Sequence, residues 1–165
     1  MSFINLISMV GTPVAVITFL FSAYQYWQNK RHEKCKETLD AYNMLQKEVF
    51  DVLYLKYTRA RIKEIAENWR KAEYKEEYHR LGVLLARIEH FCVGVEQGIY
   101  DWKIVYELGH GFFDGTMKAW LSPLVERKES FTKEELYGNL NKVWIKMAQE
   151  TDLREKLRET EGENK

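Results

Sequence analysis

The feature that most constrains this chain is its opening stretch, because Met1–Trp27 contains no charged residue. The run FINLISMVGTPVAVITFLFSAYQYW covers residues 3–27. As an α-helix, this run rises about 37 Å, which exceeds the roughly 30 Å hydrocarbon core of a bilayer. Its end carries Tyr24, Tyr26 and Trp27, whose amphipathic rings prefer the membrane interface. The sequence therefore predicts a single transmembrane anchor over residues 1–28.

Two other interpretations of this segment fit less well. A cleaved signal peptide has a positively charged start, a shorter apolar stretch and a small-residue cleavage site. Here the start has no Lys or Arg, and the apolar stretch ends in aromatic residues. A helix buried in a protein core seldom runs so far without a charge. Both comparisons favour the anchor.

Basic residues follow the apolar run directly, at Lys30, Arg31, Lys34 and Lys36, against Glu33 alone. Positive charge on one flank predicts that this flank faces the cytoplasm, with the short N-terminus outside. We also expect these side chains to contact anionic headgroups at the membrane surface. A more specific alternative is a site for an anionic signalling molecule.

Small residues in the anchor suggest contact between helices within the bilayer. Ser8, Gly11, Thr12 and Ala15 lie on a loosely common face, and such faces let helices approach closely. Pro13 lies near the predicted midplane, where it can kink the helix. Small residues are common in any spanning helix, so this pattern allows self-association without requiring it, and a homo-oligomer or a complex with a protein partner is expected.

Composition limits the class of protein. The 25 basic and 25 acidic residues balance, whereas a nucleic-acid binder shows a basic surplus, so we expect no nucleic-acid partner. With two prolines and many helix-forming residues, the chain is predicted to be all-α. The two cysteines, Cys35 and Cys92, have no CxxC spacing, which favours a reducing compartment.

Residues 29–75 are expected to form membrane-proximal helices that lead into a bundle. The helix is predicted to continue past the anchor, because apolar residues recur at steps of three and four: Leu39, Tyr42, Leu45, Val49 and Leu53. A second helix is suggested by Ile62, Ile65 and Trp69. The helix boundaries between residues 57 and 75 stay open.

Residues 76–150 should form the core of the bundle. One apolar stripe is continuous, with Leu81, Leu84, Leu85, Ile88, Phe91, Cys92 and Val95. Gly98 suits the left-handed position after a helix, and Asp101 suits the N-cap of the next, which predicts a hairpin turn at 98–101. The buried face of the following helix should comprise Val105, Leu108, Phe112, Phe113 and Trp120, and Pro123 should end or bend that helix.

The last predicted helix begins with the segment FTKEEL, residues 131–136. Thr132 and Glu135 fit a capping box, and Phe131 with Leu136 fits a hydrophobic staple. Its inner face is expected to continue through Leu140, Val143, Trp144 and Met147. The charged residues 151–165 should fray into solvent. The predicted fold is thus a transmembrane helix followed by an antiparallel bundle of about four to five helices.

The stretch RIEHFCVGVEQGIYDW, residues 87–102, holds acids, a histidine and a cysteine, yet it is best explained as a helical hairpin. Cys92 lies on the apolar stripe and should be a core residue. Glu89, His90 and Glu96 lie off the stripe and are expected to be solvated. Gly94 lowers helix propensity, which suggests a close contact there.

The longer segment ARIEHFCVGVEQGIYDWKIVYEL resembles the signature of a bacterial and phage family of unknown activity. The resemblance continues in YGNLNKVW and rests on Glu89, Gly98, Asp101, Val105, Tyr106, Trp120, Pro123 and Arg127. It covers about residues 1–30 and 80–147. It implies an N-terminal membrane helix with a helical cytoplasmic domain, and hence a bacterial inner membrane, but no reaction.

Two Glu-x-x-His pairs are the only pattern that suggests a metal: Glu76 with His79, and Glu107 with His110. Di-metal sites in helical bundles use two such pairs and two further glutamates, for which Glu89 or Glu96 could serve. The pairs lie 31 residues apart, and Glu76 belongs to a very polar stretch. We therefore predict no cofactor and no catalytic residue, and we interpret Gly109, Gly111 and Gly115 as structural.

Three functional hypotheses follow. The first is a non-enzymatic, membrane-anchored helical protein that docks a partner protein or self-assembles. The second is a bacterial anti-phage or stress effector, whose cytoplasmic bundle controls oligomerisation of the N-terminal helices. The third, which rests on the Glu-x-x-His pairs alone, is an α-helical metalloprotein.

Overall fold

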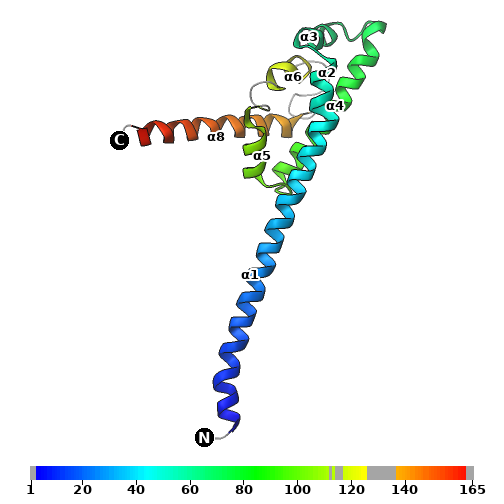
Figure 1. Cartoon of the computed structure of the whole chain (residues 1–165). Coiled ribbons are helices and arrows are strands. Elements are labelled where there is room, and N and C mark those ends of the chain that lie inside the picture. The colour runs from blue at the N-terminus through cyan, green and yellow to red at the C-terminus, as the bar shows by residue number, and fades with distance from the viewer. Residues whose placement is uncertain (1–2, 112, 114–116, 126–136, 163–165) are drawn as a thin grey trace. The chain divides into compact units, whose positions relative to one another are not determined.

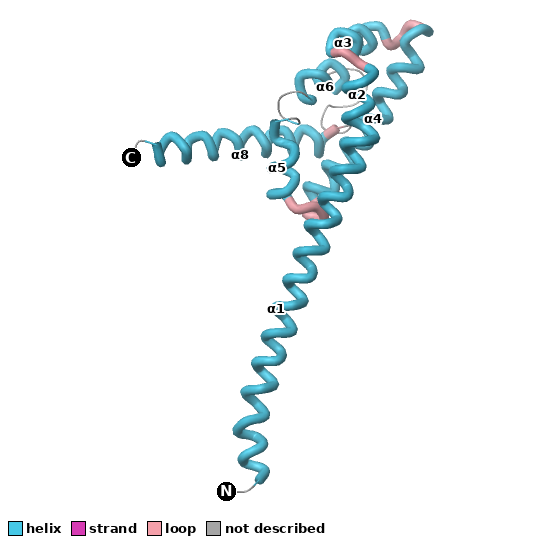
Figure 2. Tube along the Cα trace, viewed as in Figure 1, coloured by secondary structure: helices cyan, strands magenta, loops and turns pink. Residues whose placement is uncertain are grey.

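The computed structural model describes the backbone of residues 3–111, 113, 117–125 and 137–162, and the side chains of residues 3–13 and 157–162 lie outside that description. Every regular element in these residues is a helix, which confirms the all-α class (Figure 2). The chain divides into two compact units, Met1–Lys36 and Glu37–Lys165.

Figure 1 labels most of the helices that the structure describes. In chain order they are α1 (Phe3–Leu45), the π-helix η1 (Gln46–Phe50), α2 (Asp51–Lys56), α3 (Arg59–Asn68), α4 (Ala72–Glu96), α5 (Trp102–His110), α6 (Lys118–Val125) and α8 (Gly138–Gly162). The predicted anchor is the first part of α1, and the helix continues beyond it as expected. Over the part of the chain that the structure describes, however, no helix combines the length and apolar character needed to cross a membrane, so the predicted span is not supported there.

The boundaries between residues 57 and 75, which the sequence left open, are set by a cap and a tight turn. Tyr57 adopts an extended backbone and ends α2. The Thr58 side chain then accepts a hydrogen bond from the Arg61 backbone N–H at 3.2 Å, which caps the start of α3. A turn closed by the Lys71 N–H donating to the Asn68 carbonyl leads into α4.

Within the second unit, α4 packs against α3, η1 and α8, while α3 also packs against α6 and α5 against α8. The last turns of α1 and η1 run antiparallel to α4. Tyr42 lies against Phe91, whereas the later residue Glu48 pairs with the earlier residue Arg87. The bundle expected from the sequence is therefore present.

Two predicted apolar stripes form the core of this unit. The α4 stripe from Leu81 to Val95 is buried throughout, and so are Leu140, Val143, Trp144 and Met147 of α8. Two residues that were predicted to lie on buried faces are exposed instead, so these two predictions are wrong. Leu39 is 42 % exposed and Leu108 is 45 % exposed, since each lies at the margin of its buried stripe.

Pro123 lies inside α6, which continues to Val125, so the helix does not end at this proline, and the bend that the sequence also allowed stays a prediction. The charged tail at 151–165, predicted to fray, is helical through Gly162 as part of α8. Its first turn is held to α5, because the Tyr106 and Thr151 hydroxyls lie within hydrogen-bond distance at 3.1 Å.

Candidate functional site

The first unit carries the most unusual surface of the described chain, a segment of α1 whose apolar side chains are all exposed. We call Val14–Trp27 the apolar collar. Every residue in it is exposed, with Ile17 at 66 %, Phe19 at 71 % and Leu20 at 61 %. Fourteen consecutive residues cover nearly four helical turns, so the large apolar side chains are spread around most of the helix circumference. Thr18, Ser22 and Gln25, spaced four and three residues apart, share the one narrow face that is polar. A helix that is apolar around most of its circumference requires an apolar environment on most sides.

The hydroxyl of Thr18, within the collar, is hydrogen-bonded by the helix itself. The Thr18 hydroxyl donates to the Val14 carbonyl at 2.8 Å. This i to i−4 bond is the usual way in which a hydroxyl is accommodated on a helix in apolar surroundings. Thr18 therefore adds little polarity to the collar.

The C-terminal end of the collar is aromatic, as the sequence predicts. Tyr24, Tyr26 and Trp27 are 57 %, 66 % and 56 % exposed. The Gln28 amide donates to the Tyr24 hydroxyl at 2.8 Å, and the Arg31 guanidinium lies 5.7 Å from the centre of the Trp27 ring. Each contact joins an aromatic ring to the polar turn that follows, so apolar and polar surface meet within one helical turn.

The basic residues occupy the next turns of the same helix. Lys30, Arg31 and Lys36 are exposed, while Lys34 is half-buried. The Lys30 ammonium lies 3.2 Å from the Glu33 carboxylate. Of the predicted packing face, Ala15 is exposed, whereas the side chains of Ser8, Gly11 and Thr12 lie outside the described residues. Contact between anchors therefore stays a prediction.

The hairpin turn at 98–101 in the second unit has the predicted geometry. Gly98 has φ +69°, the left-handed conformation that other residues rarely adopt. The Asp101 carboxylate accepts from the Ile104 N–H at 3.3 Å and caps α5. The turn is also tied to α1, because the Asp101 N–H donates to the Thr38 hydroxyl at 2.8 Å. Thr38 is fully buried, so this stretch is a structural junction.

Gly94 makes the close contact that was predicted for it. The contact is with the aromatic ring of Tyr100, which lies in the turn after α4. A Cβ added at Gly94 would lie 2.4 Å from the Tyr100 ring. That ring stacks on Phe91, with centroids 5.0 Å apart. Cys92 is buried as expected, and burial raises the pKa of its thiol well above the ordinary value.

Glu89 was predicted to be solvated, and this is wrong. Its carboxylate caps the start of α8, accepting from the Asn139 N–H at 3.0 Å, the Asn139 amide at 2.8 Å and the Leu140 N–H at 2.8 Å. A carboxylate at a helix N-terminus satisfies orphan N–H groups and the positive end of the helix dipole. Periodicity could not reveal this role, because the capped helix begins about 50 residues later.

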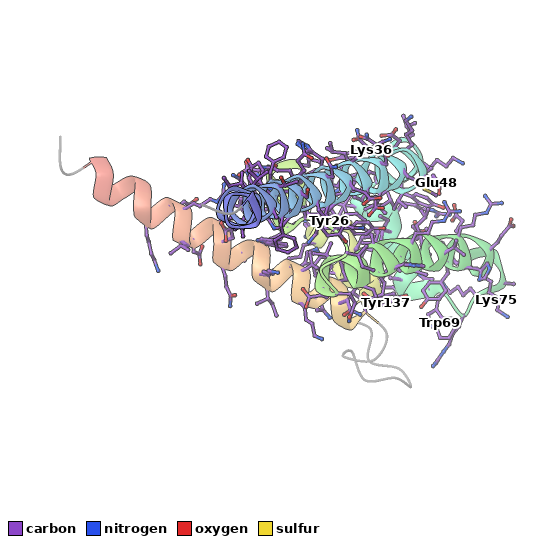
Figure 3. The ribbon with its side chains drawn as sticks, turned by 90° about the horizontal axis from the view of Figure 1, so that it is seen from below. Tyr26, Lys36, Glu48, Trp69, Lys75 and Tyr137 are labelled. Atoms are coloured by element: carbon purple, nitrogen blue, oxygen red, sulfur yellow. The ribbon has the colours of Figure 1, made fainter. Side chains whose placement is uncertain are left out.

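The predicted capping box and hydrophobic staple of the last helix stay predictions, because Thr132, Glu135, Phe131 and Leu136 lie outside the described residues. The described part of α8 begins at Gly138. Figure 3 labels Tyr137, the residue just before this helix, and burial raises the pKa of its hydroxyl.

Three of the four residues in the two Glu-x-x-His pairs make other contacts. Glu107 pairs with Arg154 of α8 at 2.7 Å, and this hydrogen bond lowers the pKa of its carboxyl. His110 stacks on Tyr106, with ring centres 4.9 Å apart. Glu76 pairs with Arg80 at 2.5 Å on the exposed side of α4. No group of three or more potential metal ligands occurs among the described residues.

Sequence reasoning missed the polar role of Tyr42, which it placed only on an apolar stripe. Tyr42 is 6 % exposed, and its hydroxyl donates to the Leu108 carbonyl at 3.0 Å. Burial raises the pKa of Tyr42 to about 12. Its ring packs with Phe50, Phe91 and Phe113 in an aromatic cluster. The sequence did contain a signal for this hydrogen bond. A tyrosine on a buried apolar stripe carries a hydroxyl, and a buried hydroxyl needs a hydrogen-bond partner.

Comparison with known proteins adds no relative: no family profile, no curated protein and no solved structure matches the chain. The resemblance carried by residues 86–108 thus stays a prediction.

Proposed function

We propose that this protein is a non-enzymatic, membrane-anchored helical docking or self-assembly protein. In this proposal residues 3–27 insert into the bilayer as a single-pass anchor, and the second unit provides the surface for a protein partner or another copy. The N-terminus lies outside, and the helical unit lies in the cytoplasm at a bacterial inner membrane.

The observation that carries the proposal is the exposure of large apolar side chains around most of the circumference of α1 in the apolar collar. A protein groove covers one face of a helix, whereas acyl chains surround it. The aromatic residues at the collar's end and the basic residues after it follow the order of hydrocarbon, interface and headgroups. The uncharged residues 3–13, known from the sequence, extend the collar toward the length of a span.

The non-enzymatic part of the proposal is supported by what the polar residues do in the second unit. Glu89 caps α8, Glu107 holds Arg154, and Arg61 bonds to both Glu64 and Glu77, at 2.9 and 2.5 Å. Each contact joins helices or stabilises one of them. These contacts hold helices of the second unit to one another, as the scaffold of a docking surface requires.

Vesicle flotation of the full chain tests the anchor. In the double variant Ile17→Lys/Leu20→Lys, two charges replace side chains of the collar, and each costs about 2.5–3.5 kcal/mol at a bilayer centre. We expect this variant to remain with the soluble fraction while the natural chain floats. Met44→Lys/Leu55→Lys is the matched control, because it also adds two charges, at residues of the second unit that are 60 % and 85 % exposed. Equal flotation of the double variant and the control would contradict the anchor.

Native mass spectrometry of the detergent-extracted complex tests the docking or self-assembly part. A fixed homo-oligomer or a complex with a second protein is the expected result. An anchor exchange then separates this proposal from a membrane-perturbing effector. A docking protein keeps its complex when residues 1–28 are replaced by an unrelated spanning helix. A complex that is lost on exchange would contradict docking through the helical unit.

A further inference from the structure

The basic turns after the apolar collar point to a specific class of lipid. We propose that residues 28–36 recruit anionic phospholipid headgroups around the anchor. This inference rests on the proposed membrane attachment and goes beyond it, because an anchor can insert without any preference among lipids.

The charge in this segment has the required sign. Residues 28–36 contain four basic residues and one acidic residue, Glu33, so their net charge is +3. The basic residues are Lys30, Arg31, Lys34 and Lys36. The chain as a whole has a net charge of zero, so this surplus is local. Anionic headgroups are the complementary surface that lies next to an inserted anchor.

The position of these residues along α1 suits headgroup contact. The rise of 1.5 Å per residue places Lys30 about 4.5 Å beyond Trp27 and Lys34 about 10 Å beyond it. The headgroup layer is about 5–8 Å thick on each side of the hydrocarbon core. Lys30 and Arg31 therefore lie at headgroup depth, and Lys34 and Lys36 lie within about one Debye length of that layer.

The direction of the side chains brings the charges closer still. In an α-helix each Cα–Cβ bond tilts toward the N-terminus. Because the collar is N-terminal to the basic residues, their long side chains lean back toward the bilayer. The Arg31 guanidinium shows this direction, since it lies 5.7 Å from the Trp27 ring, one turn nearer the collar.

Quenching of Trp27 fluorescence by brominated lipids measures which lipids surround this position. Two vesicle preparations have the same composition, with about one-fifth anionic phosphatidylglycerol in phosphatidylcholine. Bromine is carried by the anionic lipid in one, and by an equal amount of the zwitterionic lipid in the other. The signal of Trp27 is the difference between the natural chain and Trp27→Phe, because the chain has five tryptophans.

We expect the brominated anionic lipid to quench Trp27 about threefold more than the brominated zwitterionic lipid, since each basic residue near the surface adds attraction for anionic lipid. The variant Lys30→Gln/Arg31→Gln/Lys34→Gln/Lys36→Gln should abolish that preference. Salt at about 1 M should also abolish it, because the Debye length falls to about 3 Å.

The matched control is Lys47→Gln/Lys56→Gln/Lys63→Gln/Lys75→Gln. It removes the same formal charge from four exposed positions in the second unit, and it should keep the preference.

The outcomes separate the two proposals. Equal quenching by the two lipids in the natural chain would overturn anionic recruitment and leave the anchor intact. Absence of Trp27 quenching by either lipid would overturn the anchor, and the recruitment with it. A preference that survives in the basic-residue variant would show that residues 28–36 are not its source, and would also overturn the inference.

Discussion

The two units use the same kinds of side chain for opposite purposes. Ile17 and Leu20 of the collar are 66 % and 61 % exposed, whereas Ile88 and Leu85 of α4 are 0 % and 2 % exposed. All four lie on helices, so helix propensity does not separate them. The difference lies in the pattern around each residue, because large apolar residues cover most of the circumference of α1 in the collar but follow one stripe on α4. A stripe can be buried by neighbouring helices, whereas an apolar surface around most of a helix needs a surrounding apolar phase.

The largest expected effect comes from matched truncations in the two units. Ile88→Ala should lower the free energy of unfolding of the second unit by about 2–5 kcal/mol, because it leaves a cavity in the core. Ile17→Ala should change the free energy of unfolding of the second unit by less than about 0.5 kcal/mol, since Ile17 does not belong to that core. Denaturant unfolding of the full chain in detergent, followed by near-ultraviolet circular dichroism, measures both. Equal effects would break the comparison.

The next effect concerns the acid that fixes α8 to α4. Glu89→Ala should destabilise the second unit by about 2 kcal/mol, because three donors at the start of α8 lose their charged acceptor. Amide exchange at Asn139 and Leu140 should rise more than elsewhere in α8. Glu76→Ala is the control on the same helix, since the exposed Glu76–Arg80 pair contributes less than about 1 kcal/mol. Unchanged exchange at Leu140 in Glu89→Ala would contradict the cap.

A smaller effect compares two glycines of α4. Gly94→Ala should destabilise by about 1–2 kcal/mol, because strain against the Tyr100 ring outweighs the gain in helix propensity. Gly82→Ala should stabilise by about 0.5–1 kcal/mol, since among the described residues nothing beyond the local backbone of α4 and the two chain neighbours lies within 4 Å of the added Cβ. Thermal melts of both variants give the sign of each effect. Stabilisation by both substitutions would mean that Tyr100 moves aside freely.

The smallest effect is a dependence on alkaline pH. The folded state favours the neutral Tyr42 hydroxyl, whose pKa is raised to about 12. Its contribution is therefore complete below the unfolded pKa of about 10, and it is lost as pH rises from about 10 through 12. Tyr42→Phe should cost about 1 kcal/mol at pH 7 and flatten part of the alkaline loss of stability. If the stability of Tyr42→Phe falls with alkaline pH in the same way as that of the natural chain, groups other than Tyr42 cause the loss.

The sequence predicted those features that depend on local order along the chain. The buried stripe of α4, the left-handed Gly98 and the Asp101 cap each depend on residues within one or two helical turns. Such features follow from helix geometry, which fixes which side chains share a face and which N–H groups need a cap. The uncharged run before Trp27 is equally plain in the sequence.

Only the tertiary structure decided how distant residues meet. Glu89 reaches the start of α8, Thr38 receives the Asp101 N–H, and Tyr42 bonds to the Leu108 carbonyl. Each pair is separated by about 50 or more residues, so the contact depends on which helices pack together and on how far each is shifted along its axis relative to the other. Periodicity gives the direction in which a side chain points from its own helix, but the partner is supplied by another helix, whose position is set by the packing of the whole core.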